Sequence, residues 1–138
     1  MCKRAQAAAS PSVLFARTPS TYTTPSATSA SSAAGPVGDT VSVTATGGGA
    51  QVSWMSVSGA VSYNTYRGTV SNPALSYNHV CFEVGDQLAD GATLTTDAAL
   101  PPSGTAQYYL VSTVDGCGES TLGRSTGGVE RLPASACP

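Results

Sequence analysis

An all-β fold is what the sequence predicts, arranged as an antiparallel sandwich of seven strands, and three observations support this prediction. From Val37 onward, apolar and polar residues alternate with a period of two, as in strands that bury one face. Turn-forming residues interrupt this alternation about every eight to twelve residues, which is typical of a sandwich. No segment carries a sustained helical period, so we expect little or no helix.

The strands are expected in order along the chain, separated by turns rich in glycine and proline. Gly47-Gly48-Gly49 predicts the first turn and Ser58-Gly59 the second. A further turn at Pro101-Pro102-Ser103-Gly104 precedes a long aromatic and β-branched segment. The strand ranges that follow are 39–46, 50–57, 61–68, 76–82, 92–97, 105–115 and 124–132.

The composition argues against two classes of partner. Only 10% of the residues are charged and the formal net charge is -2, whereas roughly a quarter of the residues in typical soluble proteins are charged. The few basic residues are scattered, so we expect no nucleic-acid partner and no anionic membrane partner. No apolar run approaches the roughly 20 residues that a membrane helix needs, so we expect no membrane span.

Residues 1–38 differ from the rest and are expected to form an extended arm or linker rich in Ser, Thr, Pro and Ala. Such a segment cannot bury enough apolar surface to fold alone. Within it, Val13-Leu14-Phe15 is a short apolar island that needs a surface to dock on. We expect the arm to lie on a neighbouring subunit; a bare or glycosylated spacer is the alternative. The sandwich is then expected over 39–133 and a short tail over 134–138.

Four cysteines, at positions 2, 81, 117 and 137, are an even number without the close spacings of zinc or redox sites. A disulfide framework is therefore favoured, and with it an oxidising compartment outside the cell or at its surface. The alternative is four unrelated buried thiols.

Several segments together resemble a fibronectin type III domain, an immunoglobulin-like sandwich. Asp97 precedes the proline-glycine turn, the Tyr-rich segment Thr105–Asp115 follows, and Gly118-Glu119 continues the next turn. Upstream, Trp54 ends a segment that is similar to the family's second strand. The resemblance extends over roughly residues 35–132.

The resemblance implies a core centred on the tryptophan of the second strand. Alternation places Gln107, Tyr109, Val111 and Thr113 on one face of the long strand. The expected core residues are Val52, Trp54, Tyr63, Tyr109 and Val111. Two positions depart from the family's pattern: Thr65 stands where an apolar residue is usual, so its hydroxyl needs a hydrogen-bond partner, and Gln107 stands where the family has its corner tyrosine.

The resemblance also implies a cysteine pairing. Cys81 is expected late on the fourth strand and Cys117 in the turn between the last two strands, and in this fold these two places reach the same end of one sheet. Cys81–Cys117 is therefore the preferred bond. Cys2 and Cys137 then remain, and they pair either with each other or each with a neighbouring subunit.

The second face of the long strand carries Tyr108, Leu110 and Val114, which together form an apolar stripe. On a two-layer sandwich this stripe looks outward and is a candidate docking place for the arm or a partner. A register shifted by one residue would exchange the two faces.

No residues that would form a catalytic site are evident. His79 is the only histidine and lies on an expected strand without a nucleophile elbow, so we expect a solvated or hydrogen-bonded side chain. Asp86, Asp90 and Asp97 suggest calcium only weakly, because the EF-hand spacing is absent and a solvated turn accounts for the loop. We expect neither metal nor cofactor.

These observations predict a non-enzymatic extracellular structural protein. We expect a subunit of a surface appendage or filament that self-assembles through its arm and sheet edges with copies of itself. One alternative is an accessory spacer or binding module of a secreted carbohydrate-active enzyme or protease. The other is an adhesin domain, which would present an exposed cluster of tyrosines to a glycan or protein ligand.

Overall fold

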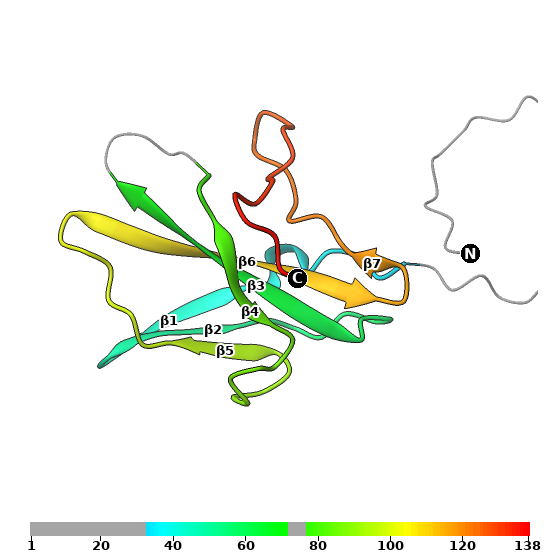
Figure 1. Ribbon diagram of the computed structural model, residues 1–138, viewed down its shortest axis with the longest axis horizontal. Helices are drawn as coiled ribbons and strands as arrows, with labels where there is room; N and C mark the ends of the chain where they lie inside the picture. Colours follow the sequence, from blue (N-terminus) through cyan, green and yellow to red (C-terminus); the bar gives the residue numbers. More distant parts are fainter. Residues whose placement is uncertain (1–32, 72–76) are drawn as a thin grey trace, which may run out of the picture.

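Seven antiparallel strands form two sheets in the computed structural model, which describes residues 33–71 and 77–138 (Figure 1). The three-stranded sheet has the order β1-β2-β5, with bounds Ser42–Thr46, Gly49–Ser53 and Leu94–Asp97. The four-stranded sheet has the order β4-β3-β6-β7, with bounds Val80–Val84, Ser62–Ser71, Thr105–Asp115 and Gly118–Glu119. A short 3-10 turn, η1 (Gly38–Thr40), precedes β1.

The turn between β1 and β2 requires glycine at its end. Gly49 has a φ of 153°, and a Cβ added there would lie 1.9 Å from the carbonyl oxygen of Asp97 on β5. Any side chain at this position would therefore push β5 away from β2. Because Gly49 lets the two backbones approach, β2 pairs with β1 on one side and β5 on the other.

The longest pairing in the molecule joins β3 and β6, from Ser62 opposite Val114 to Ser71 opposite Thr105. Aromatic and β-branched residues make up half of β3 and more than half of β6, and such residues pack well on a pleated surface. β4 pairs with the other edge of β3, with a register shift between Thr65 and Tyr66. β3 and β6 are thus the two central strands of the four-stranded sheet.

One hydrophobic cluster fills the space between the sheets. It contains all five expected core residues and one more, Val37, which lies just before η1: Val37, Val52, Trp54, Tyr63, Tyr109 and Val111. The rings of Trp54 and Tyr63 meet edge to face with their centroids 5.6 Å apart. The Tyr63 hydroxyl accepts a hydrogen bond from the Val57 amide at 2.7 Å, so its polar end is satisfied. The tyrosines that alternation directed inward therefore belong to the core.

The expected strand over 124–132 is wrong. The seventh strand is β7, only two residues long, and after it the chain forms a small turn held by an isolated bridge between Arg124 and Glu130. Gly123, Gly127 and Gly128 interrupt this stretch, and its backbone hydrogen bonds lie mostly within it. The chain is therefore free to turn back across the four-stranded sheet instead of extending it.

The hydroxyl of Thr65, for which a hydrogen-bond partner was expected, is buried without one among the described residues. This is a local cost in the core, since an unpaired buried hydroxyl loses its hydration.

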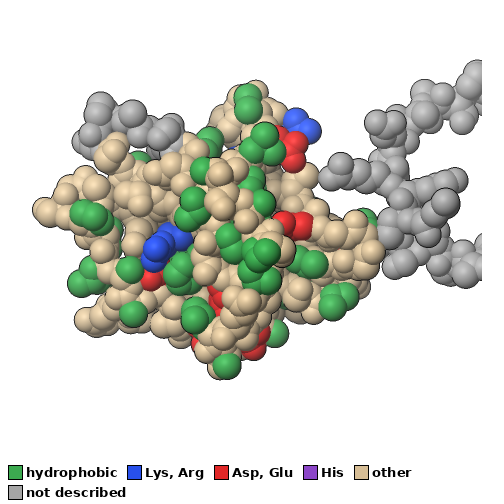
Figure 2. All heavy atoms as spheres, in the orientation of Figure 1, with side chains coloured by type: hydrophobic (Ala, Val, Ile, Leu, Met, Phe, Trp, Pro, Cys, Tyr) green, Lys and Arg blue, Asp and Glu red, His purple; other side chains and the backbone are tan. Residues whose placement is uncertain are grey.

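On the visible face, charged side chains form a few separate patches, as the low charge of the sequence predicts (Figure 2). Across the described parts of the chain, no helix has the length and apolar character that crossing a membrane requires.

Candidate functional site

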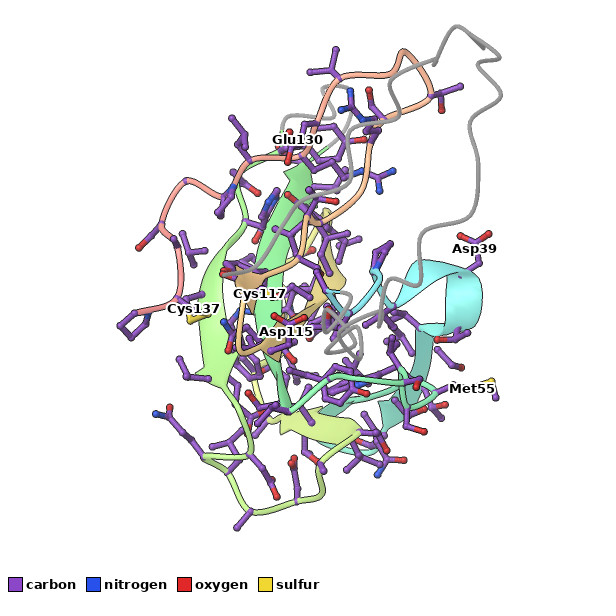
Figure 3. The ribbon with its side chains drawn as sticks, turned by 90° about the vertical axis from the view of Figure 1, so that its right-hand side faces the viewer. Asp39, Met55, Asp115, Cys117, Glu130 and Cys137 are labelled. Atoms are coloured by element: carbon purple, nitrogen blue, oxygen red, sulfur yellow. A yellow bond between two sulfur atoms is a disulfide. The ribbon has the colours of Figure 1, made fainter. Side chains whose placement is uncertain are left out.

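The chain end folds back onto the four-stranded sheet, and we call residues 133–138 the C-terminal clasp. Its main chain pairs with the free edge of β4: the Cys81 amide donates to the Ser135 carbonyl at 2.9 Å, and the Ala134 amide donates to the His79 carbonyl at 2.8 Å. A disulfide between Cys81 and Cys137 closes the clasp over the sheet (Figure 3). The clasp therefore covers an edge strand that would otherwise be open to pairing.

The predicted Cys81–Cys117 bond is wrong, because Cys81 is bonded to Cys137. The two pairings left open for Cys137, with Cys2 or with a neighbouring subunit, are wrong for the same reason. The prediction rested on which strand ends meet at one end of the sheet. It did not include the return of the chain beyond β7 along the edge of β4. Cys117, in the turn between β6 and β7, is itself disulfide-bonded, and Cys2 lies outside the described residues.

A small polar cluster lies on the sheet face beside the clasp. The Glu119 carboxylate on β7 accepts hydrogen bonds from the side-chain amide of Asn64 at 3.1 Å and the Tyr66 hydroxyl at 2.8 Å. It also accepts one from the Ser112 hydroxyl. The Tyr66 hydroxyl in turn accepts a hydrogen bond from the Cys137 amide at 3.2 Å. Burial, together with the neighbouring Glu119 carboxylate, raises the pKa of Tyr66 to about 12. This cluster connects β3, β6 and β7 to the clasp.

Of the two alternatives expected for His79, a solvated or a hydrogen-bonded side chain, the structure shows the second, and the side chain is fully buried. Its Nδ1 lies 3.2 Å from the Tyr108 hydroxyl, and its ring meets those of Tyr66, Tyr77 and Tyr108 edge to face. Burial, with a smaller effect from the Arg131 charge, lowers the pKa of His79 below its ordinary value. Among the described residues, the His79 ring makes one hydrogen bond, to Tyr108. His79 therefore has the environment of a side chain packed in the interior.

The apolar stripe expected on the outer face of β6 is only half exposed. Tyr108, Leu110 and Val114 are each partly buried. The Tyr108 ring lies over Gly68 and its hydroxyl accepts from the Asn78 amide at 3.0 Å, while Leu110 lines a hollow together with Leu122. Much of the stripe is thus covered by other segments of the described chain.

An ion pair borders the inner face of the four-stranded sheet. Arg67 Nη1 lies 2.8 Å from Asp97 Oδ2, the Tyr109 hydroxyl donates to the same oxygen at 2.8 Å, and the Arg67 guanidinium stacks on Phe82. Burial alone would raise the pKa of Asp97, but hydrogen bonds from Arg67, Ala99 and Tyr109 hold it below its ordinary value. Asp97, which the sequence grouped with a weak calcium signal, therefore links the two sheets as the partner of Arg67.

Asp86 and Asp90 lie in the loop between β4 and β5, as expected, and a third carboxylate joins them. This third carboxylate is that of Glu83, on β4, which the analysis of the sequence did not single out. One carboxylate oxygen from each of the three side chains lies within 4.8 Å of the others. The signal in the sequence that could have found Glu83 is its position three residues before Asp86.

The remaining expected assembly residues, Val13, Leu14 and Phe15, lie outside the described residues. The described chain begins with the root of the arm: the Ala34 amide donates to the Asp115 carboxylate, and the Thr113 hydroxyl donates to the Gly35 carbonyl at 2.9 Å. Ala34 and Gly35 are therefore held beside the end of β6.

The four sheet edges are not equally protected. The clasp covers β4, β7 has two residues, and β5 is largely buried and carries Asp97 facing inward. β1 pairs on one side only, with β2, and all five of its residues are exposed and uncharged. Among the described strands, β1 is the edge that lacks the usual protection of charge, proline or a covering segment.

Comparisons of the chain with protein-family models, with curated proteins and with solved structures find no significant match.

Proposed function

We propose that this protein is a non-enzymatic extracellular structural module, a fibronectin type III-like subunit that assembles with copies of itself. The observation that carries this proposal is the unprotected edge of β1. An extended segment that adds to such an edge gains main-chain hydrogen bonds without needing a charged or catalytic surface. The sandwich would thus act as the acceptor of a strand from a neighbouring copy.

The strand order supports the fibronectin type III-like assignment. β4 pairs with β3 in the four-stranded sheet, whereas the fourth strand of a constant-type immunoglobulin domain joins the sheet of the first, second and fifth strands. Trp54, directly after the second strand, and Tyr63, on the third, lie together in the core, as the family resemblance implies.

The N-terminal arm is the proposed donor. A chain as long as the part preceding Ala34 can span at most about 110–120 Å when fully extended, which is far enough to reach a neighbouring sandwich. Within it, Val13-Leu14-Phe15 is a β-prone island of the right length for one short strand. Burying these three side chains would contribute roughly 1.5–3 kcal/mol each before ordering costs, so repeated contacts along an assembly would be needed.

An exported location is part of the proposal. The Cys81–Cys137 disulfide belongs to a class of bond that forms and persists in oxidising environments. The low charge of the chain fits a surface that associates through backbone and apolar contacts. Both features suit a subunit of a surface appendage or filament.

The test places one charge on the β1 edge and the same charge on a matched central position. Thr44, Gln51 and Thr96 lie side by side on one face of the sheet, and Gln51 belongs to the central strand β2. Thr44→Lys should abolish assembly, because a charged edge residue opposes strand addition, while Gln51→Lys should assemble like the wild type. Replacing Val13, Leu14 and Phe15 together by serine should have the effect of Thr44→Lys and keeps all four cysteines.

Analytical ultracentrifugation and negative-stain electron microscopy of the full chain measure the outcome. Concentration-dependent filaments or a lattice are expected for the wild type. A wild type that stays monomeric at high concentration, or a Thr44→Lys variant that assembles normally, would replace this proposal with the spacer-module alternative.

A further inference from the structure

The three carboxylates at the end of β4 and in the following loop form a cluster that the proposed assembly does not use. Glu83 lies on β4, and Asp86 and Asp90 lie in the loop that leads to β5. One oxygen from each lies within 4.8 Å of the others. The sequence predicted a solvated turn for the acidic loop, and Asp86 in that loop is exposed, whereas Glu83 on the strand is only 2% exposed.

The buried oxygens of this cluster lack hydrogen-bond donors. Glu83 Oε1 accepts from the Leu88 amide at 2.9 Å, but Oε2 is shielded from solvent and has no partner among the described residues. Both carboxylate oxygens of Asp90 are also shielded from solvent and have no hydrogen-bond partner among the described residues. Asp86 Oδ1 accepts from the Gly91 amide at 3.1 Å, which closes the loop around the cluster. Three buried acceptor atoms of this cluster therefore have no hydrogen-bond donor among the described residues.

Among the described residues, no basic side chain lies within ion-pair distance of these carboxylates. In residues 33–71 and 77–138 the ion pair within 4.0 Å is that of Arg67 with Asp97, which is a separate site. Three like charges held this close repel one another, and a buried carboxylate without a partner is costly. Buried charges in proteins are either paired or coordinated to a metal ion.

We propose that Glu83, Asp86 and Asp90 bind a calcium ion. Calcium takes oxygen ligands at about 2.3–2.6 Å, so two oxygens on one ion lie up to about 4.6–5.2 Å apart, which accommodates the spacing of this cluster. Magnesium, with ligands at about 2.0–2.1 Å, demands a tighter arrangement. The ion supplies the positive charge that the cluster lacks and connects the end of β4 to the loop before β5.

The site is not an EF-hand, because one ligand comes from a strand and the spacing of the three acids is different. Three carboxylates provide a small ligand set, with solvent completing the coordination. Its affinity therefore belongs with extracellular modules, with a Kd of about 10⁻⁴–10⁻³ M.

The experiment compares the full-length wild type with variants that remove one charge each. Asp86 is exposed, and asparagine at this position keeps the oxygen that accepts from Gly91, so Asp86→Asn should fold. Asp90→Asn is the second variant, and Asp39→Asn, on the exposed η1 turn, is the control. Calorimetric titration with calcium chloride after chelator treatment and dialysis gives the affinity, and thermal unfolding with and without calcium gives the linked stability.

The wild type and Asp39→Asn should bind one calcium ion per chain and unfold at a higher temperature when calcium is present. Asp86→Asn and Asp90→Asn should lose at least about tenfold in affinity, since even outer-shell changes cost about 10–100-fold. In calcium-free buffer these two variants should be at least as stable as the wild type, because removing one charge relieves the repulsion. Calcium should reverse this order.

Three results would overturn the proposal. One is the absence of saturable calcium binding by the wild type up to about 10 mM, ten times the weakest expected Kd. Another is a calcium response that Asp86→Asn and Asp90→Asn retain in full, which would show a non-specific salt effect. The third is a wild type that unfolds at the same temperature with and without calcium, which would show that the ion has no preference for the folded chain.

Discussion

Removing the Cys81–Cys137 disulfide tests the folded position of the C-terminal clasp. The double variant Cys81→Ala/Cys137→Ala is the appropriate perturbation, because a single variant leaves one thiol free to exchange with the bond that Cys117 makes. Chemical reduction is less suitable, since it would break both bonds. Ser135→Ala is the matched control, because Ser135 contributes only its main-chain carbonyl to the clasp.

The magnitude follows from the length of the closed loop. Cys81 and Cys137 are separated by 56 positions, and closing a loop of this size restricts the unfolded chain by about 4 kcal/mol in the chain-entropy model. A clasp that detaches also loses its main-chain hydrogen bonds, worth about 0.5–1.5 kcal/mol each. We therefore expect the free energy of unfolding to fall by about 4 kcal/mol, a large share of the 5–15 kcal/mol of a typical domain.

Urea unfolding, followed by the fluorescence of Trp54, measures this loss, because Trp54 is the only tryptophan and is 7% exposed in the folded state. Hydrogen exchange of the Ala134 amide, which donates to the His79 carbonyl and is not itself substituted, should accelerate in the double variant. Ser135→Ala should match the wild type in both measurements. A double variant within about 1 kcal/mol of the wild type, well below the usual 2–5 kcal/mol, or non-reducing peptide mapping that links Cys81 to Cys117, would refute the reasoning.

Three other predictions concern packing and pH. A Cβ added at Gly68 would lie 2.2 Å from the ring of Tyr108, so Gly68→Ala should destabilise the protein by about 1–3 kcal/mol in urea unfolding. Gly48→Ala, in open space, should stay within about 0.5 kcal/mol, and equal effects of the two variants would contradict the packing argument. Trp54→Ala should cost about 3–5 kcal/mol by thermal or urea unfolding, and a smaller loss would mean that this side chain is not central to the core. Because burial lowers the pKa of His79 from its ordinary 6.5 in the folded state, the unfolded chain takes up the proton first. Stability should then be constant above that value and decrease as the pH falls below it, with a shallower decrease in His79→Gln. Identical pH profiles of these two proteins would show that His79 has no part in the decrease.

Much of the fold follows from the sequence because it depends on local alternation. The period of two placed Tyr109 and Val111 on the inner face of β6, and both are in the core. The bounds of β6, 105–115, agree with the expected range, and the glycine-rich turn between β1 and β2 lies where the glycines predict it. These features require only that a strand bury one face and that a turn contain residues that can form it.

The candidate sites could be predicted only in part because they depend on contacts between distant segments. Asp86 and Asp90 were recognisable as an acidic loop, but Glu83 completes the cluster from a strand, and its burial depends on what packs around β4. His79 was expected to be solvated or hydrogen-bonded, and its complete burial depends on Tyr77, Tyr108 and the clasp.

The sequence by itself determined the all-β class, the positions of most strands and the residues of the core, because the alternation of apolar and polar residues acts within each strand. The tertiary structure decided which cysteine Cys81 bonds, because the pairing depends on the path of the chain after β7. It also decided which sheet edge stays open, since the clasp covers β4 and leaves β1 exposed. Alternation carries no information about that path: a disulfide or a covered edge needs two segments far apart in the sequence to meet in space.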